Sequence, residues 1–126
     1  MISRICIILG GFYGFLAVAG GAFGAHALKS RLSPEHLAVF ETAIRYALFH
    51  ALALLAVGAL ARQSESRSLR VAGWAFAAGV PLFSGSLVLL VGTGLKWLGA
   101  VTPLGGLCFL IGWAALTAFG LKRQQM

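Results

Sequence analysis

Charged residues, and acids above all, are scarce in this chain of 126 residues. Only 10% of the residues are charged, and the three acids are all glutamates, so the sequence contains no aspartate. The hydrophobic content of 60% exceeds the roughly 45–50% of an ordinary soluble domain, and disorder would require the opposite bias. The 17 glycines follow no Gly-X-Y period, which excludes collagen. The composition therefore indicates a single integral membrane domain over residues 1–126.

Cysteines and catalytic motifs are equally few. Cys6 and Cys108 lie inside apolar segments without a CxxC or metal-ligand spacing, so we interpret them as small buried hydrophobes. The chain has no GxSxG, HExxH or Walker A motif and no paired catalytic carboxylates. His26, His50 and Glu41 are metal ligands by type, yet no two of them share a ligand spacing on one helix face. We expect no enzymatic activity, no metal and no cofactor.

Basic residues are in excess, and their positions argue against a nucleic-acid partner. The formal net charge is +7. A duplex-binding module gathers Lys and Arg on one exposed face, whereas these residues fall between long apolar runs or at the ends of the runs. That placement is typical of the flanks of membrane spans. The ten residues are Arg4, Lys29, Arg31, Arg45, Arg62, Arg67, Arg70, Lys96, Lys122 and Arg123.

Four apolar runs are long enough to cross a hydrocarbon core of about 30 Å. The first covers residues 5–27 without a charge, which is too long for a signal-peptide core of about 7–15 residues. The other three cover about 42–61, 71–91 and 104–121. The sequence therefore predicts an all-α fold, a four-helix transmembrane bundle whose main partner is the lipid bilayer.

Two of the predicted helices carry a hydroxyl residue followed by proline at their start. Ser33 is a favoured N-cap and Pro34 suits the first helical position, so a helix is predicted over 34–61. This helix is longer than the bilayer core requires, and its first turns reach into the headgroup region. Thr102 and Pro103 repeat the pattern and predict the start of the fourth span.

Pro81 lies inside the third apolar run and predicts a helix kink. A proline within a membrane helix frees a carbonyl one turn earlier, which a neighbouring helix or a nearby hydroxyl must satisfy. Ser84 and Ser86 follow at once, and we expect them to satisfy local carbonyls.

The distribution of basic residues predicts the orientation of the bundle. An even number of spans places both termini on one side, and six basic residues flank that side against three or four on the other. Under the positive-inside rule this favours N-in and C-in. The six are Arg4, Arg62, Arg67, Arg70, Lys122 and Arg123, and the others are Lys29, Arg31 and Lys96, with Arg45 if it is counted.

Small residues form a continuous seam along the first span. Helices in lipid associate through close packing and interhelical hydrogen bonds, and small residues allow two backbones to approach. The seam therefore predicts a close helix contact, either within one bundle or between copies in a homo-oligomer. Its members, at spacings of 4, 3, 4 and 3, are Gly10, Gly14, Ala17, Gly21 and Gly24.

Five polar residues at membrane depth are the candidate binding residues: His26, Glu41, Arg45, Tyr46 and His50. Ionisable groups at such depths are costly, and by default they mark an internal or water-accessible site. Glu41 and Arg45 are spaced i, i+4 in the favourable order for an ion pair, while Tyr46 and His50 lie on a second stripe. A straight helix cannot direct all of them to one point, so we expect the pair and the stripe to face different neighbours.

Each of these groups has a structural and a functional interpretation. Glu41 and Arg45 form either a clamp at the bilayer edge or, through Arg45, an anion or proton site. His50 is either a hydrogen-bonded packing residue or a ligand or proton relay, since imidazole has the unperturbed pKa nearest neutrality.

Four ordered blocks resemble the family known as domain of unknown function 423, with YgdD- and YwdK-like bacterial members and the eukaryotic transmembrane protein 256 group. The resemblance covers nearly the whole chain and implies a four-span protein of the inner (plasma) membrane without an established activity. The family pattern often has a polar residue at the position of Ala47 and tyrosine at that of Phe49, so the resemblance implies that any polar site to which those groups contribute would be reduced in this chain. The blocks are GAFGAHALK (21–29), RYALFHALALL (45–55), AGWAFAAGVPLFSGSL (72–87) and LGAVTPLGGLCFLIGW (98–113).

Two functions are compatible with these observations. The first is a non-enzymatic protein that binds or passes a small solute, ion or proton through a polar site in its outer half, using Arg45, Tyr46 and His50. Four short spans are few for a transporter, so this function implies a homo-oligomer. The second is a structural or assembly factor whose glycine-rich helix faces pack against other membrane proteins. A water path to His50 would favour the first, and close-packed surroundings would favour the second.

Overall fold

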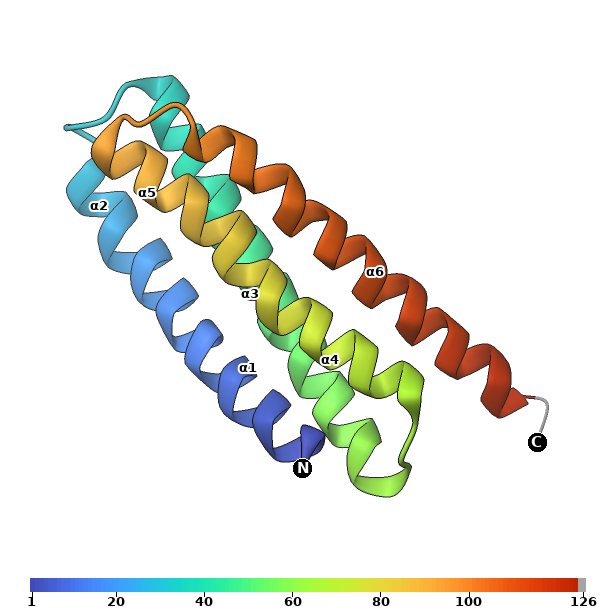
Figure 1. Ribbon diagram of the computed structural model, residues 1–126. Helices are drawn as coiled ribbons and strands as arrows, with labels where there is room; N and C mark the ends of the chain where they lie inside the picture. The colour runs from blue at the N-terminus through green and yellow to red at the C-terminus, as the bar shows by residue number, and fades with distance from the viewer. Residues whose placement is uncertain (125–126) are drawn as a thin grey trace.

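The computed structural model describes residues 1–124, and over this range the chain forms four long helical segments without a strand (Figure 1). All four are long and apolar enough to cross a membrane, which confirms the all-α prediction and the count of four candidate spans. Residues 125 and 126 of the predicted domain lie outside the described part. The segments are α1 (Ile2–Ala19), η1 (Gly20–Gly24) and α2 (Ala25–Leu28); α3 (Pro34–Gln63); α4 (Arg67–Val80), η2 (Pro81–Gly85) and α5 (Ser86–Thr93); and α6 (Leu98–Gln124).

The four segments run up and down, so the start of α1 and the end of α6 lie at one end of the bundle together with the α3–α4 connection (Figure 1). The first segment packs mainly along α3, and α4 packs mainly along α6. Contacts of α3 with α4, η2 and α5 join these two helix pairs. The core is built from buried apolar side chains of all four segments, among them Cys6, Leu54, Phe76 and Phe109.

The predicted start of the second helix is confirmed, whereas that of the fourth is wrong. The Ser33 side chain accepts a hydrogen bond of 3.1 Å from the His36 amide, and Pro34 follows it in the first turn. The fourth helix instead begins at Leu98, and Pro103 lies inside it. Proline lacks an amide hydrogen, so Pro103 cannot donate to the carbonyl of Gly99 four residues earlier. This loss is tolerated because Gly99 is an exposed residue near the helix end.

A carbonyl freed by Pro81 is satisfied from a different helix. Pro81 begins η2, a π-helical turn, and cannot donate to the carbonyl of Ala77 four residues earlier. The hydroxyl of Tyr13, on α1, donates to that oxygen at 2.7 Å. Ser86 also follows the prediction, because its hydroxyl donates to the Phe83 carbonyl at 2.9 Å. Ser84 does not: its hydroxyl has no hydrogen-bond partner, so the prediction was wrong for this residue.

The small residues of the first span face α3 of the same chain. A Cβ atom added at Gly10 would lie 2.9 Å from the carbonyl oxygen of Ala51, and one at Gly24 would lie 2.7 Å from the ring of Phe40. At Gly10 the distance leaves no room for a side chain, so the two backbones approach closely there only because glycine is present. At Gly24 the absence of a side chain makes room for the Phe40 ring. Gly14 and Gly21 face α3 more loosely, and Ala17 is buried.

Candidate functional site

His50, on α3, lies in an aromatic cluster formed with Phe76, Phe109 and Trp113. Its side chain is 4% exposed. The imidazole stacks on the Phe109 ring with a centroid distance of 3.5 Å and an interplanar angle of 9°. The Phe76 and Trp113 rings approach at 5.5 and 5.8 Å and are strongly inclined to it. His50 therefore joins α3 to both α4 and α6.

Both ring nitrogens of His50 have hydrogen-bond partners. The indole nitrogen of Trp113 donates to Nε2 at 3.0 Å, and Nδ1 lies 2.7 Å from the carbonyl oxygen of Tyr46. Because an indole N–H can only donate, Nε2 must accept, and the proton resides on Nδ1, which donates to the carbonyl. The contacts define a neutral imidazole with one tautomer. They agree with the packing interpretation of this histidine.

Glycines in the facing helices make room for this cluster. A Cβ atom at Gly79 would lie 2.5 Å from the Phe109 ring, and one at Gly112 would lie 2.5 Å from the Phe76 ring. Each ring therefore packs onto the backbone of the opposite helix. The positions of the rings around His50 depend on these two glycines.

The other four candidate binding residues lie in different surroundings. Tyr46 is 38% exposed and stacks on Phe83 with a centroid distance of 4.6 Å. Glu41, Arg45 and His26 are exposed. No ion pair within 4.0 Å joins Glu41 to Arg45, both of which the structure describes, so the expected pair is not formed.

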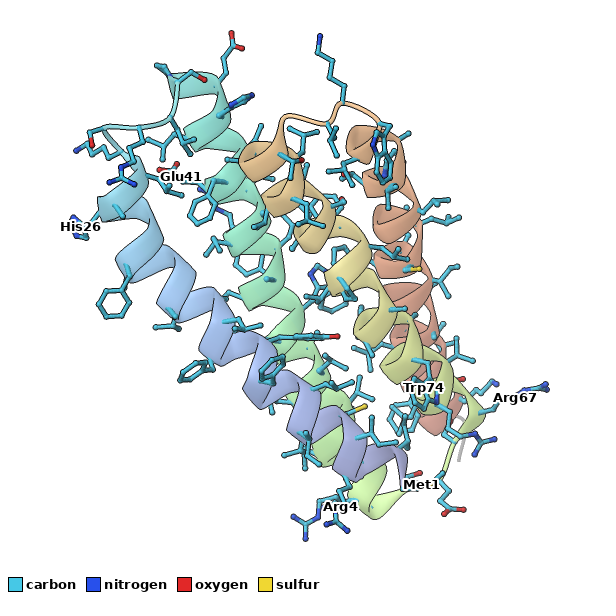
Figure 2. All side chains as sticks on the ribbon, turned by 60° about the vertical axis from the view of Figure 1, so that its left-hand side comes forward. Met1, Arg4, His26, Glu41, Arg67 and Trp74 are labelled. Atoms are coloured by element: carbon cyan, nitrogen blue, oxygen red, sulfur yellow. The ribbon has the colours of Figure 1, made fainter. Side chains whose placement is uncertain are left out.

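The structure thus brings Tyr46 and His50 together and leaves the remaining candidates apart. Figure 2 shows His26 and Glu41 at one end of the bundle, with Met1, Arg4 and Arg67 at the other. His26 belongs to α2 and Glu41 to α3. Within the described residues, no three His, Cys, Asp or Glu side chains gather in a way that could hold a metal ion.

A groove of about 570 Å³ lies between α1, α3 and the η2–α5 segment. Its lining is apolar except for Tyr13 and Ser84. Small residues from three segments belong to its lining: Ala17, Gly20, Ala43, Ala47 and Gly85. Sequence reasoning missed this groove, because it arises where α1 and α5 diverge over α3. The small residues of α3 were the available signal.

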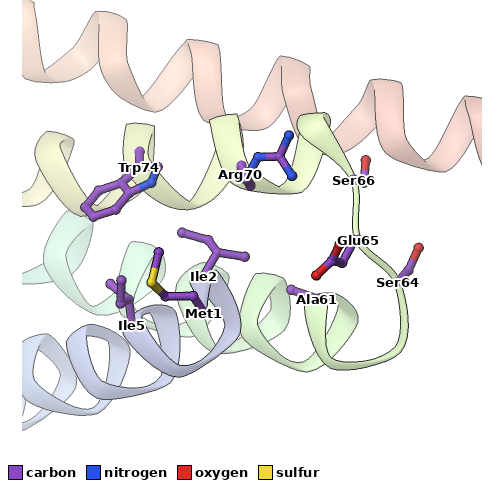
Figure 3. Close-up of a pocket in the computed structure, with 9 residues that line it drawn as sticks. All are labelled: Met1, Ile2, Ile5, Ala61, Ser64, Glu65, Ser66, Arg70 and Trp74. Carbon is purple, nitrogen blue, oxygen red and sulfur yellow. The ribbon is translucent and has the colours of Figure 1, made fainter.

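A second, smaller cavity of about 150 Å³ lies at the end that holds the termini (Figure 3). Met1, which precedes α1, and Ile5 of α1 face Arg70 and Trp74 of α4, and Glu65 lines the cavity from the connecting loop. Trp at such a level is typical of an interface anchor. The side chains that line the cavity include one acid, Glu65, and one base, Arg70, both exposed.

The family of proteins of unknown function named DUF423 matches residues 20–106. The chain belongs to this family. This DUF423 chain is 43% identical over 120 residues to the UPF0382 membrane protein YwdK of Bacillus subtilis, covering 94% of the chain and 98% of that protein. It is 45% identical over 113 residues to a UPF0382 membrane protein of Staphylococcus aureus (strain bovine RF122 / ET3-1), covering 90% and 92%. No solved structure matches.

Membership of DUF423 confirms the resemblance seen in the four sequence blocks. The names of both relatives place them in a membrane and give no activity. The four long apolar helices of this chain agree with that location. The DUF423 protein is therefore a membrane protein of unknown function.

Proposed function

We propose that this protein is a non-enzymatic membrane protein that binds a lipophilic molecule in the groove between α1, α3 and α5. The observation that carries the proposal is the groove itself, with its volume of about 570 Å³ and its almost wholly apolar lining. Binding sites for small molecules are typically about 300–1,000 Å³, mostly apolar, with a few polar groups, and they occur between the helices of bundles. Because the walls belong to candidate membrane spans, a ligand would enter from the lipid.

The size of the groove favours a small lipophile over a helix of a partner protein. An α-helix with its side chains is about 10–12 Å wide and rises about 5.4 Å per turn, so each turn occupies roughly 400–600 Å³. The groove can therefore hold most of a small molecule, whereas a transmembrane helix several turns long would lie largely outside it. The glycine seam does not supply a further docking face, since it packs against α3.

The surroundings of His50 give less support to passage of a solute, ion or proton. Both of its ring nitrogens are occupied, and its side chain is packed among aromatic rings. Neither of the two cavities described above includes His50 or Arg45 in its lining. A homo-oligomer, which solute passage implied, is not required by a groove that one chain completes alone.

Filling the groove tests the proposal. Ala47→Leu adds a branched side chain to its α3 wall, and Gly85→Leu does so from the opposite wall, where a new Cβ would meet only Pro81, at 4.0 Å. Ala56→Leu adds the same group to an exposed position of α3 outside the lining and serves as the control.

Native mass spectrometry of the protein extracted into lipid nanodiscs is the measurement. We expect a retained lipophile on the wild type and on Ala56→Leu, and its loss from both groove-filling variants. Absence of any adduct from the wild type, or equal retention by the filled variants, would overturn the proposal. The same spectra report the oligomeric state.

We also propose that both termini face the cytoplasm and that the protein resides in the inner (plasma) membrane. The support is the excess of basic residues at the terminal end, where Arg4, Arg62, Arg67, Arg70 and Lys122 lie by their place in the helices. The side chain of Arg123 lies outside the described part. A C-terminal alkaline phosphatase fusion, which is active only outside the cytoplasm, should be inactive. Activity of that fusion would contradict the orientation.

A further inference from the structure

Ser84 is one of two polar side chains, with Tyr13, in the otherwise apolar lining of the groove. Its side chain is 5% exposed, and its hydroxyl is the one buried side-chain polar atom without a hydrogen-bond partner among the described residues. A hydroxyl in an apolar environment is costly unless it finds a partner, and membranes offer no water to supply one.

The neighbouring hydroxyl groups are already engaged. That of Tyr13, which also lines the groove, donates to the Ala77 carbonyl. That of Ser86 donates to the Phe83 carbonyl and lies 2.6 Å from the hydroxyl of Thr102. The donor capacity that remains for a molecule in the groove is therefore that of Ser84.

The depth of Ser84 limits the chemistry of its partner. The span Arg67–Thr93 contains 27 residues and is therefore about 40 Å long, so about 5 Å projects beyond a 30 Å hydrocarbon core at each end. Ser84 lies nine residues before Thr93, about 13 Å below the end of the helix, and hence roughly 8 Å inside the hydrocarbon. A phosphate or ammonium headgroup is too costly at this depth, whereas a neutral oxygen is acceptable.

We infer that the groove selects a neutral lipophile whose carbonyl or hydroxyl oxygen accepts a hydrogen bond from Ser84. Lipid quinones and long-chain alcohols share this chemistry, and a phospholipid acyl chain lacks it at this depth. The inference rests on the proposed function, because it names the ligand class of the same groove. Apolar contacts supply affinity for the chain of the ligand, and Ser84 supplies the preference for an oxygen.

Three probes of similar size separate the alternatives. Decyl-1,4-benzoquinone presents a carbonyl oxygen, 1-hexadecanol presents a hydroxyl, and decylbenzene presents neither. Each is titrated into nanodisc-embedded protein, and binding is measured by native mass spectrometry. For Ser84→Ala we expect about 3- to 10-fold weaker binding of one or both oxygen-bearing probes, the effect of one lost hydrogen bond, with unchanged binding of decylbenzene. The probe that loses affinity identifies the source of the oxygen.

Two further variants complete the design. Ser84→Thr keeps the hydroxyl and should retain the preference for the oxygen-bearing probes. Thr117→Ala removes a hydroxyl of α6 that bonds to the Trp113 carbonyl outside the groove, and it should bind all probes as the wild type does. Ser84→Ala removes a hydroxyl without a partner, so folding should be preserved.

The results separate this inference from the proposed function. If Ala47→Leu abolishes binding while Ser84→Ala weakens no oxygen-bearing probe, or weakens decylbenzene equally, the groove binds lipophiles without the selectivity and the inference fails. If no probe binds the wild type, the proposed function fails with it.

Discussion

Replacing Tyr13 by phenylalanine removes one hydroxyl and retains the aromatic ring. That hydroxyl donates to the carbonyl of Ala77 at 2.7 Å, and Pro81 has no amide hydrogen with which to replace it. The variant therefore removes a hydrogen bond from a backbone acceptor to which Pro81 cannot donate. The change tests whether the π-helical turn at Pro81 is supported by α1.

Two ranges of hydrogen-bond energy set the loss of stability that we expect for Tyr13→Phe. A buried acceptor left without a partner costs about 1–3 kcal/mol. Interhelical hydrogen bonds in membrane proteins average only about 0.6 kcal/mol, with a maximum of about 1.7, because the unfolded chain in the membrane also finds partners. Since the acceptor is a backbone carbonyl to which Pro81 cannot donate, we expect Tyr13→Phe to destabilise the fold by about 1–2 kcal/mol.

A double-mutant cycle that combines Tyr13→Phe with Pro81→Ala tests whether Tyr13 replaces the missing donor of Pro81. Pro81→Ala supplies an amide hydrogen that can donate to the Ala77 carbonyl within the same helix. In that background Tyr13→Phe should cost less than about 0.5 kcal/mol, so the two substitutions should be coupled by roughly 1 kcal/mol.

The free energy of unfolding is measured by titration with sodium dodecyl sulfate in mixed micelles, followed by circular dichroism. Tyr46→Phe is the matched control: it also removes a phenolic hydroxyl, from a residue that is 38% exposed, and should change stability by less than about 0.5 kcal/mol. An equal cost of Tyr13→Phe with and without Pro81 would refute the account of the freed carbonyl.

Two further predictions concern the aromatic cluster, with unfolding in the same micelles as the measurement. Gly112→Ala places a Cβ atom against the Phe76 ring and should lower the free energy of unfolding by about 1–3 kcal/mol. Gly120→Ala, whose new Cβ meets nothing within 4 Å, is the control and should be neutral or slightly stabilising. Equal effects of the two substitutions would contradict the packing of the Phe76 ring on Gly112. Trp113→Phe removes the donor to Nε2 of His50 and should lower the free energy of unfolding of the wild type by about 1 kcal/mol. In a His50→Phe background the same substitution should cost little. An undiminished loss of stability in that background would argue against the hydrogen bond.

The spans could be predicted from sequence because they depend on local properties. Run length and hydropathy mark the four helices, and the Ser33–Pro34 pair marks a helix start through contacts within four residues. The similar pair at Thr102 failed for a physical reason: proline disturbs only the carbonyl four residues earlier, and near an exposed helix end that loss is inexpensive. Instead of capping the helix, the Thr102 hydroxyl donates to the Leu98 carbonyl and shares a hydrogen bond with the Ser86 hydroxyl.

The candidate site depended on contacts that sequence spacing does not encode. The stripe that joins Tyr46 to His50 was visible in the helical period, yet the Trp113 donor lies 63 residues away along the chain. The expected Glu41–Arg45 pair had the right spacing but belongs to exposed side chains, for which such pairs contribute little. The groove depends on the divergence of two helices, which only the tertiary arrangement decides.

The hydrogen bond from Trp113 to His50 has a consequence for the order in which the helices assemble during synthesis. The donor belongs to the last helix, whereas the acceptor belongs to the second. During synthesis the imidazole enters the membrane well before the indole that completes its hydrogen bonding. The final span therefore completes the bundle by supplying the donor for Nε2 of His50. In a nascent chain interrupted before this span, that nitrogen has no indole donor.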